Sequence, residues 1–172
     1  LAREYSVFAT PGNLNSETGL PLSVLATSAT HDIAVYELAM NHAGEIAPLA
    51  RIVRPEVAVI TNIGTAHIGN LGSREAIALE KKQITAAFDG EQTLFVPSDD
   101  GYAATLAENV DGRVVFVATS GGPVAIEHDG GDSYLLLVDG QRVIIPLPGY
   151  HNARNALLAA TVAHHLGAGA QA

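Results

Sequence analysis

The sequence contains no cysteine, so it forms no disulfide and has no thiol for catalysis or metal binding. It has no apolar run near the length of about 20 residues with which a helix crosses a bilayer. Positive charge is scarce, because 9 Lys and Arg stand against 18 Asp and Glu and the net charge is −9. This acidity argues against general binding to nucleic acid or anionic membranes. We therefore expect a cytoplasmic globular protein with no nucleic-acid or membrane partner.

Short apolar runs alternate with helical segments up to about residue 118. Strands are expected at residues 5–9, 33–38, 57–60, 93–96 and 113–118. The helix around Pro21 is expected to bury Leu22, Val24 and Leu25. This alternation predicts an α/β fold, with a mostly parallel, doubly wound sheet and flanking helices. The 172 residues are enough for one domain with a proper core.

The pattern changes between residues 124 and 148, where short apolar runs are separated by Asp-Gly pairs. The pair Asp139-Gly140 between two such runs is a strong hairpin signal. We expect a small antiparallel three-stranded sheet here, followed by an alanine-rich helix at about residues 151–166. The prediction is therefore a parallel α/β core at residues 1–120 and 149–172, with the small sheet at 121–148.

The most informative stretch runs from residue 57 to residue 84. An unbroken apolar strand ends in a loop, residues 63–72, that contains His67, and Ser73 can cap the helix that follows. On that helix, Lys81 falls in the same stripe as Ile77 and Ile84. An ammonium group in an apolar stripe costs free energy unless it is paired, modified or at the edge of a site. Lys81 either extends to solvent from the rim of the core or has a function.

Three ionisable residues, Glu37, His67 and Lys81, are predicted to meet where strands and a helix converge. Carboxylate oxygens and imidazole nitrogens are plausible ligands for Mg²⁺ or Mn²⁺. Each residue also has an ordinary explanation: Glu37 could pair with an arginine, and His67 could be a loop histidine with satisfied hydrogen bonds. Asparagines are dense around the same edge, although turn formation explains any single one. They are Asn13, Asn15, Asn41, Asn62 and Asn70.

Two polar residues near the carboxyl end, His151 and Asn155, stand four residues apart on one side of the last predicted helix. A side-chain amide is suited to reading an adenine edge, whereas helix solubility is the ordinary explanation. The sequence has no G-x-x-x-x-G-K-[ST] motif, so these residues do not supply a complete P-loop nucleotide site.

Five segments occur together in an order that is specific as a set. They are GNLNSETGLPL (12–22), VYELAMNHAGEI (35–46), ITNIGTAHIGNLGS (60–73), EKKQI (80–84) and GYHNARNA (149–156). The set resembles the central ATPase domain of the Mur ligases, and within them the members that add D-Ala-D-Ala to a UDP-MurNAc-peptide during peptidoglycan synthesis. The resemblance implies amide-bond formation driven by ATP through an acyl phosphate, with two Mg²⁺ ions neutralising the phosphates.

The resemblance also implies roles for individual residues. Glu37 and His67 match the family's Mg²⁺-binding residues, and Lys81 matches the lysine that CO₂ carbamylates in many members. Carbamylation would remove the stray cation and supply oxygen ligands, and Lys81 and His67 are taken as the catalytic pair. Asn155, with His151 beside it, matches the residue that contacts adenine. Asn13, Asn15 and Asn41 are expected on the muramoyl-peptide side.

Several features depart from the family pattern. The family's P-loop is expected just before Leu1, and the amino-terminal UDP-binding domain and the carboxyl-terminal domain are also expected outside this chain. We expect the 172 residues alone to be inactive as a ligase. Ser16 and Gln83 replace residues that are more often asparagine and an acid. The alternatives are another superfamily member, of the folylpolyglutamate or cyanophycin synthetase type, and a non-catalytic nucleotide- or ligand-binding module that keeps the fold.

Overall fold

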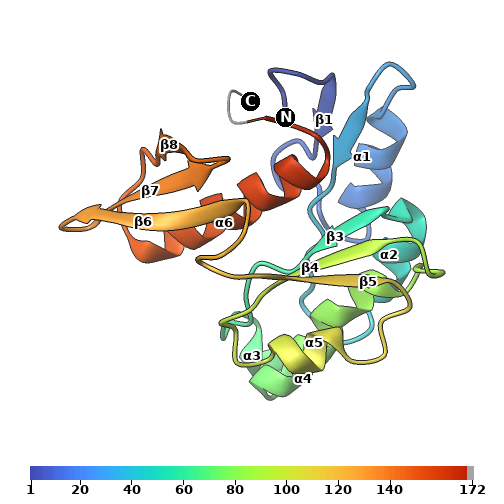
Figure 1. Ribbon diagram of the computed structural model, residues 1–172. Coiled ribbons are helices and arrows are strands. Elements are labelled where there is room, and N and C mark those ends of the chain that lie inside the picture. Colours follow the sequence, from blue (N-terminus) through green and yellow to red (C-terminus); the bar gives the residue numbers. More distant parts are fainter. Residues whose placement is uncertain (170–172) are drawn as a thin grey trace.

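The computed structural model describes residues 1–169 and contains two parallel ladders and one antiparallel sheet (Figure 1). Strands β1 (Val7–Ala9) and β2 (Ile33–Val35) pair with each other. Strands β3 (Val57–Val59), β4 (Thr93–Pro97) and β5 (Arg113–Val117) form the second ladder in the order β3-β4-β5. The predicted mixed α/β fold with parallel strands is confirmed. The parallel strands are divided between two ladders, which the sequence did not indicate. An alternation of strand and helix predicts the direction of the strands but does not specify which strands pair.

Strand β4 is buried on both faces. Leu94 and Val96 are fully buried in one hydrophobic cluster, and Phe95, which is 1% exposed, belongs to a second cluster. Successive side chains of a strand point to opposite faces, so this alternation places one cluster on each side of the sheet. The covered strand was predicted at residues 57–60, where Ala58 and Ile60 are buried in the first cluster and Val57 and Val59 pack, partly buried, against the second.

Helices cover the first face of the β3-β4-β5 ladder and pack on Leu94 and Val96. Helices α4 (Arg74–Lys82) and α5 (Ala103–Ala107) contribute Ile77 and Leu106 to the first cluster. Helix α2 (Ile46–Val53) contributes its first residue to the same cluster. Helix α1 (Gly19–Ala26) contacts α2.

The segment around Lys81 differs from the prediction in two details. The expected loop at residues 63–72 contains the short helix α3 (Ile68–Leu71). Helix α4 ends at Lys82 and continues as the 3₁₀ turn η1 (Gln83–Thr85), so Ile84 lies beyond the α-helix. Ile84 nevertheless packs, partly buried, against the same cluster as Ile77, so the predicted apolar stripe continues through the 3₁₀ turn.

The antiparallel sheet consists of β6 (Val124–Gly130), β7 (Ser133–Val138) and β8 (Gln141–Ile144). Asp139 and Gly140 join β7 to β8 with φ values of +50° and +77°, so both are left-handed, as a type I′ hairpin requires. Helix α6 (Tyr150–His165) lies against this sheet in Figure 1. Its residues Leu157 and Leu158 belong to the same hydrophobic cluster as Phe95 and buried side chains of the sheet. The predicted three-stranded sheet and hairpin are confirmed. No helix within residues 1–169 is long and apolar enough to cross a membrane.

The start of α4 is fixed by Ser73, whose hydroxyl accepts a hydrogen bond from the backbone N–H of Ala76 at 3.1 Å. We expect Ser73→Ala to lower the free energy of unfolding by about 1 kcal/mol, because an N–H group of the first turn loses its acceptor. Urea unfolding measures this change. Ser98→Ala, at another exposed serine, is the control and should be nearly neutral. An equal loss in both variants would contradict the capping role.

Candidate functional site

A cavity of about 170 Å³ lies beside Lys81 and is open to solvent on one side. Its lining comes from the segment after β2, the segment after β3, and helices α2 and α4. The lining residues are Leu38, Ala39, Met40, Ile46, Gly64, Ala66, His67, Ile77 and Lys81. The structure thus brings His67 and Lys81, which sequence reasoning had grouped, into one cavity.

The amino group of Lys81 is held at the cavity by a backbone carbonyl. Its Nζ donates a hydrogen bond to the backbone carbonyl of Asn62 at 2.8 Å. Burial lowers the pKa of Lys81 from its ordinary value of 10.5, and the negative charge of Asp100 partly opposes this shift. The amine is therefore neutral over a wider pH range than that of a solvated lysine. A neutral amine is a nucleophile, which an ammonium group is not.

His67 occupies a backbone conformation that few residues other than glycine adopt. Its φ is +64°, and it directly precedes α3, where its carbonyl accepts the N–H groups of Asn70 and Leu71 at 3.0 and 3.1 Å. The side chain is exposed and lines the cavity. A left-handed residue with a side chain at a cavity is a candidate for function, because the strained backbone fixes where that side chain stands.

Glu37 lies two residues beyond the end of β2 and is exposed. Its Oε1 accepts a hydrogen bond from the side-chain amide of Asn15 at 2.8 Å, and its backbone N–H donates to Thr10 Oγ1 at 3.0 Å. This partner is a neutral amide, whereas the alternative considered was an arginine. The bond fixes the carboxylate while its charge remains available to a cation.

The loop that carries Asn41 is anchored from several sides. The backbone N–H of Asn41 donates to Glu45 at 2.6 Å, which lowers the pKa of that carboxyl, and its carbonyl accepts the amide of Asn70 at 3.0 Å. The side chain of Asn41 is exposed. Asn13 is also exposed, and its carbonyl accepts the N–H of Asn15 at 2.8 Å.

Glu80 is a buried carboxylate that sequence reasoning missed. It is 7% exposed, and its two oxygens accept the backbone N–H groups of Gly44 and Ile46, both at 2.9 Å. Glu80 thereby ties α4 to the first residues of α2 and to one wall of the cavity. Its position three residues after Ile77, on the inward face of α4, is the signal that could have identified it.

A second group of contacts, also missed, fixes the loop after β3. Asp100 accepts the N–H of Ile63 at 2.8 Å and that of Tyr102 at 2.9 Å. Arg74 donates to the carbonyl of Ile63 at 2.7 Å, and its guanidinium lies 5.3 Å from the centre of the Tyr102 ring. The peptide groups on both sides of Ile63 are therefore held, which also fixes the neighbouring carbonyl that accepts from Lys81.

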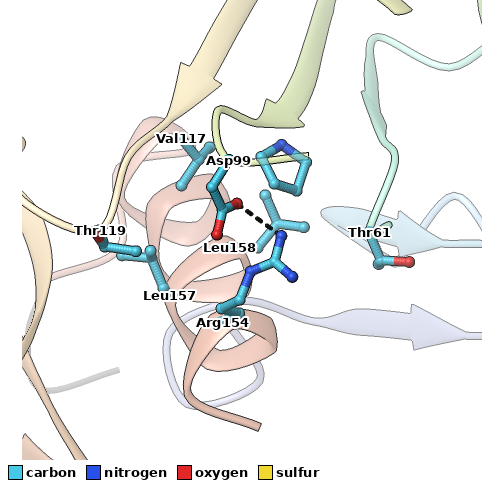
Figure 2. A pocket seen from close by; sticks show the side chains of 8 residues that line it. Thr61, Asp99, Val117, Thr119, Arg154, Leu157 and Leu158 are labelled. Carbon is cyan, nitrogen blue, oxygen red and sulfur yellow. Dashed lines mark hydrogen bonds and ion pairs between the residues drawn. The ribbon is translucent and has the colours of Figure 1, made fainter. Parts of the chain in front are cut away.

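His151 and Asn155 lie apart from the cavity, on the exposed surface of the first turns of α6. Between them, Arg154 donates to Asp99 at the carboxyl end of β4 over 2.7 Å, as Figure 2 shows. Thr61, which follows β3, stands across the same small hollow. The start of α6 is thus attached to the edge of the sheet where the loops from β3 and β4 emerge.

The described residues, 1–169, contain no group of three or more His, Asp or Glu side chains that could hold a metal. Glu37, His67 and Lys81 therefore do not belong to a dense cluster of protein ligands. Of the three, His67 and Lys81 line the cavity, whereas Glu37 is not among its lining residues and only its neighbour Leu38 is.

Comparisons with known proteins show the family to which the chain belongs. The family model described as Mur ligase middle domain matches residues 1–163. The UDP-N-acetylmuramoyl-tripeptide–D-alanyl-D-alanine ligase of Treponema pallidum is 44% identical over 168 residues, which cover 96% of this chain and 36% of that protein. The chain thus spans little more than a third of the length of this curated relative.

Solved structures show the same fold at comparable identity. A crystal structure of MurF from Acinetobacter baumannii superposes with a TM-score of 0.88 at 33% identity, covering 99% of this chain and 39% of that one. The MurF ligase of Thermotoga maritima in complex with ADP gives a TM-score of 0.77 at 31% identity, covering 97% and 40%. The extent of the family match and these superpositions establish that the chain belongs to the Mur ligase family, in which it corresponds to the middle domain.

Proposed function

We propose that this chain is the central part of an ATP-dependent ligase that joins D-Ala-D-Ala to a UDP-MurNAc-tripeptide during peptidoglycan precursor synthesis. The observation that carries the proposal is the Lys81 amine, which has a lowered pKa and shares a cavity with His67. The name of the Treponema pallidum relative supports the choice of substrates. The remaining parts of the site would come from other parts of the same protein: a phosphate-binding loop just before Leu1 and the flanking domains. We place this protein in the cytoplasm.

The proposed reaction forms one amide bond in two steps. The terminal carboxylate of the peptide attacks the γ-phosphorus of ATP, a new O–P bond forms, and the bond to ADP breaks. The amine of D-Ala-D-Ala then attacks the acyl carbon, loses a proton, and expels inorganic phosphate. Phosphoryl transfer of this kind depends on positioning and on stabilising negative charge, so the protein must hold the phosphates close to fixed groups.

The residues around the cavity fit a magnesium site of the usual kind. Mg²⁺ keeps several waters and uses one or two carboxylates together with substrate phosphates, so a dense protein cluster is not required. Glu37, oriented by the Asn15 amide, and His67 would hold the ions, of which we propose two. When bound, Mg²⁺ neutralises the charge that develops on the transferred phosphate.

Lys81 would contribute as a carbamate. Its ammonium group first loses a proton, and the neutral amine then attacks CO₂: an N–C bond forms, one C–O π bond breaks, and the nitrogen releases a second proton. The product is an anion with two oxygen ligands in place of a cation. The lowered pKa of Lys81 favours the neutral form that this reaction needs. The bond of Lys81 to the Asn62 carbonyl beside the cavity supports this role over that of a lysine simply extended to solvent.

The polar groups at the start of α6 would contact adenine, with the Asn155 amide as the main contact and His151 beside it. We expect Asn155→Ala in the whole protein to weaken ATP binding by about 1–2 kcal/mol, because one amide contact is lost. Isothermal titration calorimetry measures the affinity. Ala159→Ser, at an exposed position of the same helix, is the control and should leave it unchanged. An unchanged affinity in Asn155→Ala would remove this residue from the nucleotide site.

The asparagines near Glu37 would face the muramoyl peptide. Asn15 is already committed to Glu37, so it would act chiefly by orienting that carboxylate. Asn13 and Asn41 are exposed and have free access to a substrate from the loops after β1 and β2.

The whole protein that carries this chain provides the test. It is incubated with ATP, UDP-MurNAc-tripeptide and D-Ala-D-Ala, and mass spectrometry detects the ligated product while ADP release is followed. Reactions without D-Ala-D-Ala, and with folate and glutamate in place of both substrates, are the controls. A product formed only in the reaction with folate and glutamate would assign the protein to the folylpolyglutamate synthetase type. ATP binding without turnover in any mixture would support a binding module.

A further inference from the structure

Two adjacent aspartates just beyond β4 connect the loop beside the Lys81 cavity with the start of α6. Asp100 holds the loop after β3, whose Asn62 carbonyl accepts from Lys81. Asp99 accepts from Arg154 at 2.7 Å, and Arg154 lies on α6 directly before Asn155 (Figure 2). The end of one strand therefore fixes both the lysine loop and the helix that carries the proposed adenine contact.

The apolar packing of α6 does not by itself fix the orientation of the helix, and this ion pair can do so. Leu157 and Leu158 press the helix against the sheet in the cluster of Phe95. Apolar contacts are not directional, so they hold the helix against the sheet without strictly fixing its rotation or its displacement along its axis. A guanidinium–carboxylate contact depends on geometry, and it acts within the same turn of the helix as His151 and Asn155. Arg154 is thus placed to fix how the polar side of α6 faces the sheet edge.

The exposure of the two side chains indicates that the ion pair contributes more to the position of α6 than to the stability of the fold. The side chains of Arg154 and Asp99 are 27% and 42% exposed, and ion pairs in such surroundings contribute little to folding. A comparable pair, Arg142 with Glu127 at 3.1 Å, lies wholly within the antiparallel sheet and links no parts of the site. That pair is a matched control.

We propose that Asp99 is a positioning residue for the nucleotide: through Arg154 it holds α6 in the orientation in which Asn155 and His151 meet the base. The inference rests on the proposed function, since it requires that α6 bind ATP. A positioning contact can change affinity by no more than its own interaction free energy, so its loss should have a moderate effect.

The experiment uses the whole protein and measures the dissociation constant for ATP in the Asp99→Ala, Arg154→Gln and double variants. Each single variant should raise the constant about three- to fivefold. The double variant should match the single ones, because each removes the same contact. Arg154→Lys should keep most of the affinity, Glu127→Gln should match the parent, and the KM for D-Ala-D-Ala should not change in any variant.

Other results would overturn the inference. Additive losses in the double variant would mean that the two residues act separately. A loss in Arg154→Gln without one in Asp99→Ala would mean that Arg154 touches the nucleotide itself. Unchanged affinity in both variants, with a parent that binds ATP, would reject the positioning role and leave the proposed function intact. A parent that does not bind ATP would instead reject the proposed function.

Discussion

Lys81→Met in the whole protein should lower the ligation rate by about 10²–10³-fold or more, the usual cost of removing one preorganised group that stabilises the transition state. The substitution keeps the apolar stem and removes the amine that burial already disfavours as a cation. The free energy of unfolding should therefore change by less than about 1 kcal/mol. Steady-state kinetics and urea unfolding measure the two quantities separately.

The neighbouring Lys82 supplies a control with the opposite expected profile. Its Nζ donates to the carbonyls of Thr105 and Glu108 at the end of α5, away from the cavity. Lys82→Met should lower the free energy of unfolding by about 1 kcal/mol and leave the ligation rate near that of the parent. Ligation that persists in Lys81→Met, or that falls equally in both variants, would contradict the role proposed for Lys81.

The lowered pKa of Lys81 also gives the pH dependence its sign. The folded state binds fewer protons than the unfolded state between the lowered pKa and the ordinary value of 10.5. The free energy of unfolding should therefore rise with pH across that window. Carbamate formation needs the neutral amine, so a ¹³C NMR carbamate signal from ¹³CO₂ should grow with pH and be absent in Lys81→Met. A signal that grew as the pH fell would contradict the proposal.

Glu80→Ala should be the most destabilising single substitution proposed for this chain. It leaves the buried N–H group of Ile46 and the part-buried N–H group of Gly44 without their acceptor. An unpaired buried donor costs about 1–3 kcal/mol and the part-buried one costs less, so we expect a loss of about 2–4 kcal/mol in the free energy of unfolding. Ligation should also weaken, because the wall of the cavity that includes Met40 and Ile46 loses its anchor.

Urea unfolding of three variants separates the contributions at this position. Glu80→Gln keeps a side-chain oxygen that can accept one of the two bonds, so its loss should be about half as large. Glu75→Gln changes an exposed acid on the same helix and should shift stability by less than about 0.5 kcal/mol. Equal stability of Glu80→Ala and the parent would mean that water replaces the carboxylate at no cost, against our expectation.

Features that depend on neighbouring residues could be predicted from the sequence. The cap at Ser73 and the hairpin at Asp139-Gly140 need only a short segment, since a hydroxyl or a left-handed pair acts locally. The meeting of Lys81 and His67 followed from one rule, that parallel strands end at the same edge. Such inferences need no knowledge of distant partners.

Features that depend on distant partners could not be predicted. Glu80 and Asp100 bind backbone groups 34 to 37 residues away, and nothing in the local pattern specifies those partners. The expected burial of Leu22 and Leu25 is wrong, since they are 55% and 81% exposed. Helix α1 is apolar at nearly every position, so its sequence does not indicate which side meets the core. In the structure, Leu20 is the leucine of this helix that is buried in the core.

The two-faced burial of β4 has a consequence for motion. Helix α6 and the antiparallel sheet share a cluster on the side of Phe95, whereas Leu94 and Val96 lie beneath α4 and α5. The layer with α6 can therefore open as one cooperative unit without uncovering the layer beside the Lys81 cavity. Under the proposed function, we expect the layer with α6 to loosen when the spent nucleotide leaves. The loops and helix that carry His67 and Lys81 would then stay assembled from one turnover to the next.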